Sequence, residues 1–258
     1  MLIAPHPDDE ALACSVILQQ AVRAGAAIRI VYVTDGDDNP WPQRALERRW
    51  SLSPSDRKRW GKLRRAEALA ALRVLDIRPA DVQFLALPDQ GLTDLLLRDC
   101  DRALTRITRV IDDWSPTDIL APSLFDIHPD HNAVAVMMRL IFADFLPRIS
   151  QWNYLVHGDS PAFFDRAAEL SSSELETAKK REAIRCHHSE VLKNARTWRF
   201  QRRRTDVNSG KHWQRCYAFS LCNFLVRRFY EASDPNNLSC GFALGSNSEI
   251  AVRWAENL

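Results

Sequence analysis

The chain has 258 residues, of which 46% are hydrophobic and 26% are charged. This length is enough to bury a large core, and the composition is that of an ordinary globular protein, which excludes a wholly disordered chain. The formal net charge of +2 is too small to indicate a nucleic-acid or anionic-membrane partner by itself.

The cysteines are scattered without a C-x-x-C pair, and no signal peptide or membrane-length apolar run stands out. We therefore expect a cytoplasmic protein with free thiols. The residues before Pro5 make only a short first strand, which leaves open whether Met1 is the natural start.

Apolar strands alternate with amphipathic helices through the first part of the chain. Strands are expected at 2–4, 28–34, 82–87, 118–121 and 151–157, and helices at 10–24, 62–76, 93–114 and 132–146. Residues 35–60 are expected to form a long polar connection. We predict a Rossmann-like, doubly wound α/β fold with a mostly parallel sheet of about five strands.

The pattern changes beyond Gly158. Ser173-Glu-Leu-Glu176 is a capping box that opens a charged helix towards Lys193, and a basic run at 196–204 and an aromatic stretch at 216–230 follow. We predict an α/β core over residues 1–158 and a C-terminal extension over residues 159–258, helical and irregular, that packs on the core.

Two motifs carry metal-binding residue types. His6-Pro-Asp-Asp-Glu10 follows the first strand, and Asp126-Ile-His-Pro-Asp-His131 follows the fourth. Parallel strands place both at the carboxyl rim of the sheet. Catalytic zinc takes three nitrogen, oxygen or sulfur ligands from the protein and leaves one position for water, and these motifs can supply them. The alternative, turns whose histidines only hydrogen bond, is weaker for two motifs than for one.

Together the motifs resemble those of the PIG-L/LmbE-like zinc-dependent N-acetyl-sugar deacetylases. The resemblance extends to Thr34-Asp-Gly36, Arg64-x-x-Glu67, Phe84 to Asp89 and Lys180 to Glu190, and covers roughly residues 1–190. The family commonly has glutamine where this chain has Glu190.

Carried over position by position, the resemblance implies that His6, Asp9 and His131 bind zinc or another divalent metal. It implies Asp8 as the general base. It implies that His128, as an imidazolium, supports the tetrahedral intermediate.

Arg64 and Asp89 resemble family positions near the sugar, where they would bind hydroxyl groups. Arg64 fits equally well as a partner of Glu67 on one helix face.

The remaining polar residues are given supporting roles or none. Asp126 and Asp130 are expected to orient the histidines of the site. Glu10 fits a charge at a helix start better than a ligand. His157 and His212 are lone histidines without an assigned function.

The predicted activity is hydrolysis of an N-acetyl group from a glucosamine-type sugar or glycoconjugate. One alternative is a metal-dependent hydrolase of another amide or ester, because the site alone does not demand an acetyl group. Another is a non-catalytic protein that binds an anionic glycan through residues 196–204. Aromatic residues within that basic run leave contact with an anionic membrane surface open. No nucleic-acid partner is expected.

Overall fold

The structure is a computed structural model that describes residues 1–145, 149–158 and 170–190. Most of the predicted extension therefore lies outside the described residues, as do His212, the basic run 196–204 and the aromatic stretch 216–230.

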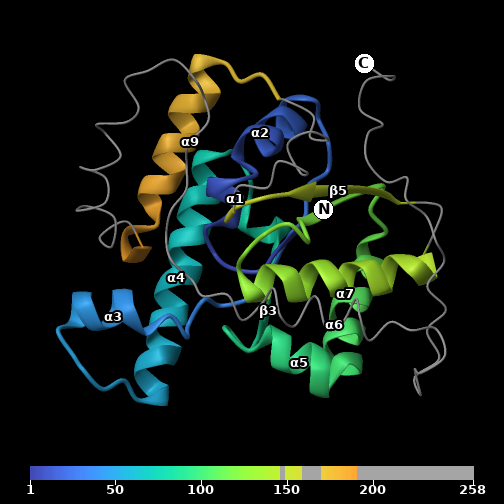
Figure 1. The fold of residues 1–258 in the computed structure, drawn as a ribbon. Coiled ribbons are helices and arrows are strands. Elements are labelled where there is room, and N and C mark those ends of the chain that lie inside the picture. The colour runs from blue at the N-terminus through green and yellow to red at the C-terminus, as the bar shows by residue number, and fades with distance from the viewer. Residues whose placement is uncertain (146–148, 159–169, 191–258) are drawn as a thin grey trace.

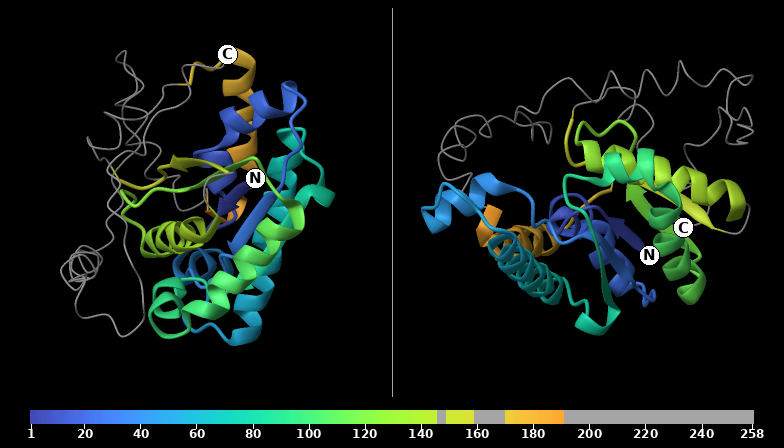
Figure 2. Two further views of the ribbon diagram at one scale, coloured as in Figure 1. Left: turned by 90° about the vertical axis from the view of Figure 1, so that its right-hand side faces the viewer. Right: turned by 90° about the horizontal axis from the view of Figure 1, so that it is seen from below.

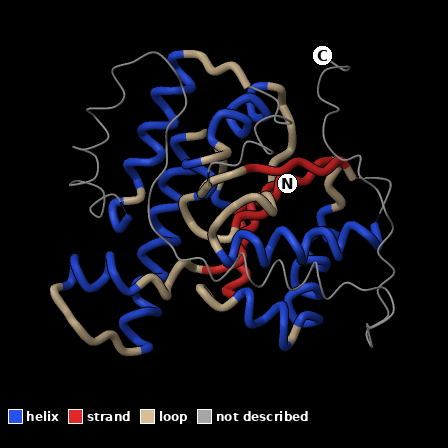
Figure 3. The backbone as a smooth tube through the Cα atoms, viewed as in Figure 1, coloured by secondary structure: helices blue, strands red, loops and turns tan. Residues whose placement is uncertain are grey.

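All strands of the sheet run parallel, in the order β3-β2-β1-β4-β5 (Figures 1 and 3). The strands are β1 (Leu2–Ala4), β2 (Ile30–Thr34), β3 (Val82–Leu87), β4 (Asp118–Pro122) and β5 (Ser150–Tyr154). The chain adds β2 and β3 on one side of β1 and then returns to add β4 and β5 on the other. This arrangement confirms the predicted doubly wound fold, and it places the reversal of strand order between β1 and β4.

Helices cover both faces of the sheet (Figures 1 and 2). The helices are α1 (Asp9–Leu12), α2 (Ser15–Arg23), α3 (Pro40–Glu47), α4 (Pro54–Val74), α5 (Leu92–Arg98), α6 (Cys100–Trp114), α7 (Pro129–Phe145) and α9 (Glu174–Cys186). A short 3-10 helix spans Pro79–Asp81. Helices α5, α6 and α7 pack on one face, and α1, α2, α4 and α9 pack on the other.

Alternate side chains of the central strands build the two hydrophobic cores. Ile3 and Val31 point to the core under α5, α6 and α7, whereas Leu2 and Tyr32 point to the core under α4. Because both faces are covered, these strands are apolar at nearly every position, as is typical of parallel sheets.

Residues 35–60 are not the single polar connection that the sequence suggests. They contain α3 and the first turns of α4, which begins at Pro54 rather than at Lys62. Ser53 and Asp56 form a capping box, and Pro54 occupies the first helical turn. The start of α4 is rich in charged residues, which hides its helical periodicity.

Other boundaries also differ from the expectation. The predicted helix 10–24 is divided into α1 and α2, and the helix 93–114 into α5 and α6. The capping box at Ser173 and Glu176 is confirmed, but α9 ends at Cys186. Cys14, Cys100 and Cys186 are free thiols. Within the described part of the chain, no helix is both long enough and apolar enough to cross a membrane.

Candidate metal centre

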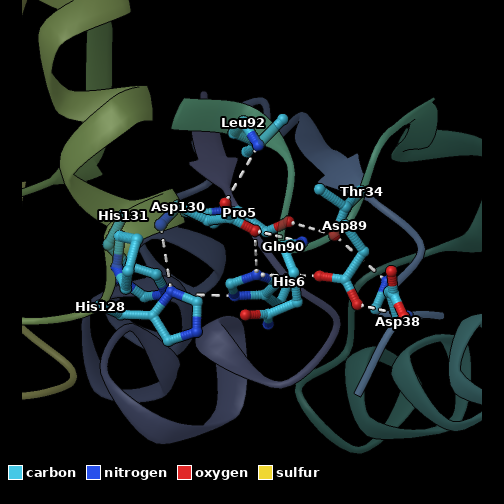
Figure 4. Close-up of polar contacts among 12 residues, drawn as sticks. Pro5, His6, Thr34, Asp38, Asp89, Gln90, Leu92, His128, Asp130 and His131 are labelled. Carbon is cyan, nitrogen blue, oxygen red and sulfur yellow. Dashed lines mark hydrogen bonds and ion pairs between the residues drawn. The ribbon is translucent and has the colours of Figure 1, made fainter. Parts of the chain in front are cut away.

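The two histidine motifs meet at the carboxyl rim, between β1 and β4 (Figure 4). His6 lies two residues after the end of β1, and His131 lies in the first turn of α7, which follows β4. In doubly wound sheets, ligands bind where the strand order reverses. The site predicted from sequence therefore lies where this fold places binding sites.

Two of the residues predicted as metal ligands, His6 and Asp9, each face the third, His131. His131 Nε2 lies 3.3 Å from both His6 Nδ1 and Asp9 Oδ1. All three side chains are buried. His6 Nδ1 and His131 Nε2 face each other, and only one of them can carry a hydrogen at this distance. The buried Asp9 Oδ1 makes no hydrogen bond within the described part of the chain. Inward-facing nitrogen and oxygen donors of this kind fit a divalent cation such as zinc.

His128 extends this group of donors. A ring nitrogen of His128 lies within 4.8 Å of ring nitrogens of His6 and His131, so these three imidazoles could also hold an ion. The ring centroids of His6 and His128 are 4.7 Å apart.

Two carboxylates hold His6 from the side opposite its facing nitrogen (Figure 4). Its Nε2 lies 3.2 Å from Asp130 Oδ2 and 3.3 Å from Asp89 Oδ1. Asp130 is itself fixed because it accepts hydrogen bonds from the backbone N–H groups of Gln90 at 2.8 Å and Leu92 at 3.1 Å. These contacts confirm that Asp130 supports a histidine of the site, and they leave His6 Nδ1 free to face His131.

Asp126 plays the corresponding part for His131, as expected. Its Oδ2 lies 3.1 Å from His131 Nδ1, and its carboxylate accepts backbone N–H bonds from His128, Val156 and His157. The same carboxylate contacts His157 Nδ1 at 3.3 Å. Burial alone would lower the pKa of His131, but Asp9 and Asp126 raise it to about 9.

His157 is therefore not the lone histidine that the sequence suggests. Its ring centroid lies 5.0 Å from that of His131, and its side chain is 40% exposed. The available signal was its place as the last residue of the fifth predicted strand, since the carboxyl ends of parallel strands share one rim.

Asp8 lies beside the ligands and is held by Arg64. Arg64 Nη2 donates to Asp8 Oδ2 at 2.9 Å and also to the carbonyl oxygen of Pro7, while Nη1 donates to Gly36 O at 3.2 Å. A Cβ at Gly36 would lie 2.2 Å from Nη1, so only glycine admits this guanidinium. Burial raises the pKa of Asp8 to about 6, against the opposing effect of Arg64. This value suits a general base at neutral pH.

The pair of Arg64 with Glu67, one of the two alternatives for this arginine, does not form. Glu67 instead accepts hydrogen bonds from the backbone and hydroxyl of Ser189, which follows α9. Arg64 Nη1 lies 3.6 Å from Glu190 Oε1, so the glutamate found in place of the family's glutamine is a second anion beside this arginine.

The hydrogen bonds of His128 define its tautomer. Its Nδ1 accepts from the backbone N–H of Asp130 at 3.2 Å, so the ring proton of the neutral form is on Nε2. Burial, together with His6 and His131, lowers the pKa of His128 to about 2. The imidazolium expected from the sequence is therefore disfavoured, and His128 is a neutral donor through Nε2–H.

Glu10 is more than a charge at a helix start. It lies in the first turn of α1, as expected, but its side chain is buried. Its Oε1 lies 2.7 Å from Nε2 of the buried His187, and its Oε2 accepts from the backbone N–H of Asp8 at 2.9 Å. The sequence offers no sign of this pair, because it depends on how the end of α9 packs against α1.

Comparison with known proteins matches this chain to one family and to solved structures of the same fold. The family described as PIG-L, GlcNAc-PI de-N-acetylase, matches residues 1–142. No match is found among curated proteins.

Several solved structures share the fold. The conserved protein TT1542 from Thermus thermophilus is 22% identical, with a TM-score of 0.55, over 79% of this chain and 85% of its own. A deacetylase triple mutant of the teicoplanin biosynthetic pathway is 24% identical, with a TM-score of 0.56, over 75% of this chain and 84% of its own. The N,N'-diacetylchitobiose deacetylase from Pyrococcus horikoshii is 18% identical, with a TM-score of 0.54, over 73% of this chain and 68% of its own.

Proposed function

The chain belongs to the PIG-L family, and from this premise we propose that it is a metal-dependent deacetylase. Its substrate would be an N-acetylated, glucosamine-type sugar or glycoconjugate, from which it releases acetate and a free amine. The contacts of buried His131 with both His6 and Asp9, next to Asp8 in the same motif, carry this proposal. Fold relatives described as deacetylases support it.

His6, Asp9 and His131 would hold the metal, for which zinc is the first candidate because the donors are imidazole and carboxylate. A divalent ion held there would supply a water of lowered pKa and a Lewis acid for the amide carbonyl. Asp130 and Asp126 would keep the two histidines in the required orientation.

Asp8 would take a proton from the attacking water and pass it to the leaving amine, for which its pKa of about 6 is well placed. His128 would donate its Nε2–H to the oxygen that gains negative charge, as a neutral group already held in place by the Asp130 backbone.

Arg64 and Asp89 fit positioning roles better than direct contact with the sugar. Their side chains are 4% and 1% exposed, and they contact Asp8 and His6 respectively. We therefore propose that Arg64 holds the base and that Asp89 helps Asp130 to hold His6. His157, which is half-exposed at the rim, is better placed to meet a sugar hydroxyl.

The test is a panel of N-acetylated mono- and disaccharides and one N-acetylated glycolipid, with acetate and primary amine measured together. Equal amounts of both products are expected. Activity should be lost when a chelator removes the metal and should return when zinc is added. Other amides and esters in the same panel test the alternative hydrolase.

A protein that contains no divalent metal, and whose Asp8→Ala variant releases acetate at the wild-type rate, would refute the mechanism. Binding of an anionic glycan without turnover of any compound in the panel would favour the non-catalytic alternative.

A further inference from the structure

Asp8 has an unusual backbone conformation. Its φ is 137° and its ψ is −20°, in the region that residues with a side chain rarely adopt. Such conformations persist only where the surrounding structure holds them, and they concentrate at functional sites. The proposed base therefore depends on contacts that fix its backbone as well as its carboxylate.

Two side chains supply these contacts. Arg64 holds the Asp8 carboxylate and the preceding carbonyl oxygen, that of Pro7. Glu10 holds the backbone, because its Oε2 accepts the Asp8 N–H at 2.9 Å. If the Glu10 carboxylate moved away, this buried turn would lose the acceptor of that N–H.

His187 fixes Glu10 in turn. The distance from His187 Nε2 to Glu10 Oε1 is 2.7 Å, and both side chains are buried. Glu10 therefore uses one carboxylate oxygen for the Asp8 backbone and the other for His187. A buried carboxylate without the second contact would be poorly compensated and would seek another position.

The position of His187 is itself well defined. It directly follows α9, whose buried Ala183 belongs to the same hydrophobic core as residues of α1, α2 and α4. Two residues later, Ser189 donates two hydrogen bonds to Glu67 of α4. These contacts come from beyond residue 142, where the matched family model ends, and from the segment 180–190, whose sequence also resembles the family.

We propose that Glu10 and His187 are positioning residues for the base: His187 fixes the Glu10 carboxylate, which holds Asp8 in its strained conformation. Neither residue touches the reacting atoms. The inference rests on the proposed function, in which Asp8 moves the proton. It adds that the segment after α9, which lies beyond the matched model, completes the active site.

The experiment compares His187→Ala with His188→Ala in the full-length zinc-loaded protein. His188 is the exposed neighbour and serves as the matched control. For His187→Ala, kcat should fall about 10- to 100-fold, because small displacements of a catalytic group cost rate on that order. KM and the zinc content should stay within about two-fold of wild type, because the ligands are untouched.

Conservative variants separate positioning from general damage. His187→Gln keeps an N–H donor for Glu10 and should restore most of kcat, and Glu10→Gln keeps an acceptor for the Asp8 N–H and should do likewise. The double variant with alanine at both positions should be no slower than Glu10→Ala alone, because the two residues act through one contact.

The inference is overturned if His187→Ala keeps the wild-type kcat, if it loses zinc in parallel with activity, or if the two alanine substitutions act additively. If His187→Ala does not fold, His187→Gln decides: activity no better than that of Asp8→Ala would overturn the proposal. A wild-type protein that releases no acetate would instead overturn the proposed function and this inference together.

Discussion

Replacement of Asp126 by asparagine should weaken zinc binding about 10- to 100-fold, the usual effect of losing the partner of a ligating histidine. One oxygen of Asp126 accepts from the His128 N–H at 2.9 Å, and the other accepts from the Val156 and His157 N–H groups at 3.0 Å each. An amide replaces one of these oxygens by NH₂, so at least one buried N–H then faces another donor. That costs about 1–3 kcal/mol.

The loss in zinc affinity corresponds to about 1.4–2.7 kcal/mol, whereas the cost of the unpaired N–H is a separate loss of stability that is present with and without the metal. The assay is competition for zinc with a chromophoric chelator, with the midpoint of thermal unfolding measured in parallel. Asp113→Asn, an exposed aspartate of α6, is the control for loss of one negative charge. If Asp126→Asn bound zinc within two-fold of wild type and unfolded at the same temperature, the supporting role of Asp126 would be refuted.

Three further predictions concern the base and the core. Asp8→Asn should retain its metal while kcat falls roughly 10²- to 10⁴-fold, measured by metal analysis and acetate release; loss of the metal would argue that Asp8 is a ligand. Burial raises the pKa of Asp8 to about 6, and the negative charge of Glu190 acts in the same direction. We therefore expect kcat/KM to fall as the pH drops through that value. Glu190→Gln removes a negative charge and should move this limb of the pH profile to lower pH, whereas a shift to higher pH would contradict the assignment. Leu72→Ala, fully buried in α4, should lower the free energy of unfolding in urea by about 2–5 kcal/mol. Leu63→Ala, 43% exposed on the same helix, should change it by less than about 0.5 kcal/mol, and equal losses would contradict the packing argument.

The sequence predicted the rim of the site because that prediction needs only local information. A motif that follows an apolar strand lies at the carboxyl edge, and two such motifs in a parallel sheet lie at the same edge. This reasoning brought His6 and His131 together although 125 positions separate them.

Contacts that depend on tertiary packing were beyond the same reasoning. In a sequence, an exposed glutamate in the first turn of a helix cannot be told from a buried one. The sequence around Glu10 therefore did not indicate its contact with His187. Arg64 offered a local partner in Glu67, but the absence of a side chain at Gly36 lets its guanidinium reach Asp8 instead. Each of these contacts joins segments whose mutual position is set by the packing of α4 and α9 on the sheet.

The charge balance of the rim gives an independent reason to expect a cation there. Five carboxylates are buried around the histidines, namely Asp9, Glu10, Asp89, Asp126 and Asp130. Buried carboxylates are costly unless positive charge or hydrogen bonds compensate them. Part of the compensation comes from a proton on His131, whose pKa Asp9 and Asp126 raise to about 9 although burial opposes this. His131 must lose this proton before it can bind a metal. The proton and a divalent ion are therefore alternative ways to balance the negative charge of the same carboxylates. The supporting carboxylates therefore do more than orient the imidazoles: neutral residues at 126 and 130 would remove two of the five buried carboxylates whose negative charge can balance a doubly charged ion.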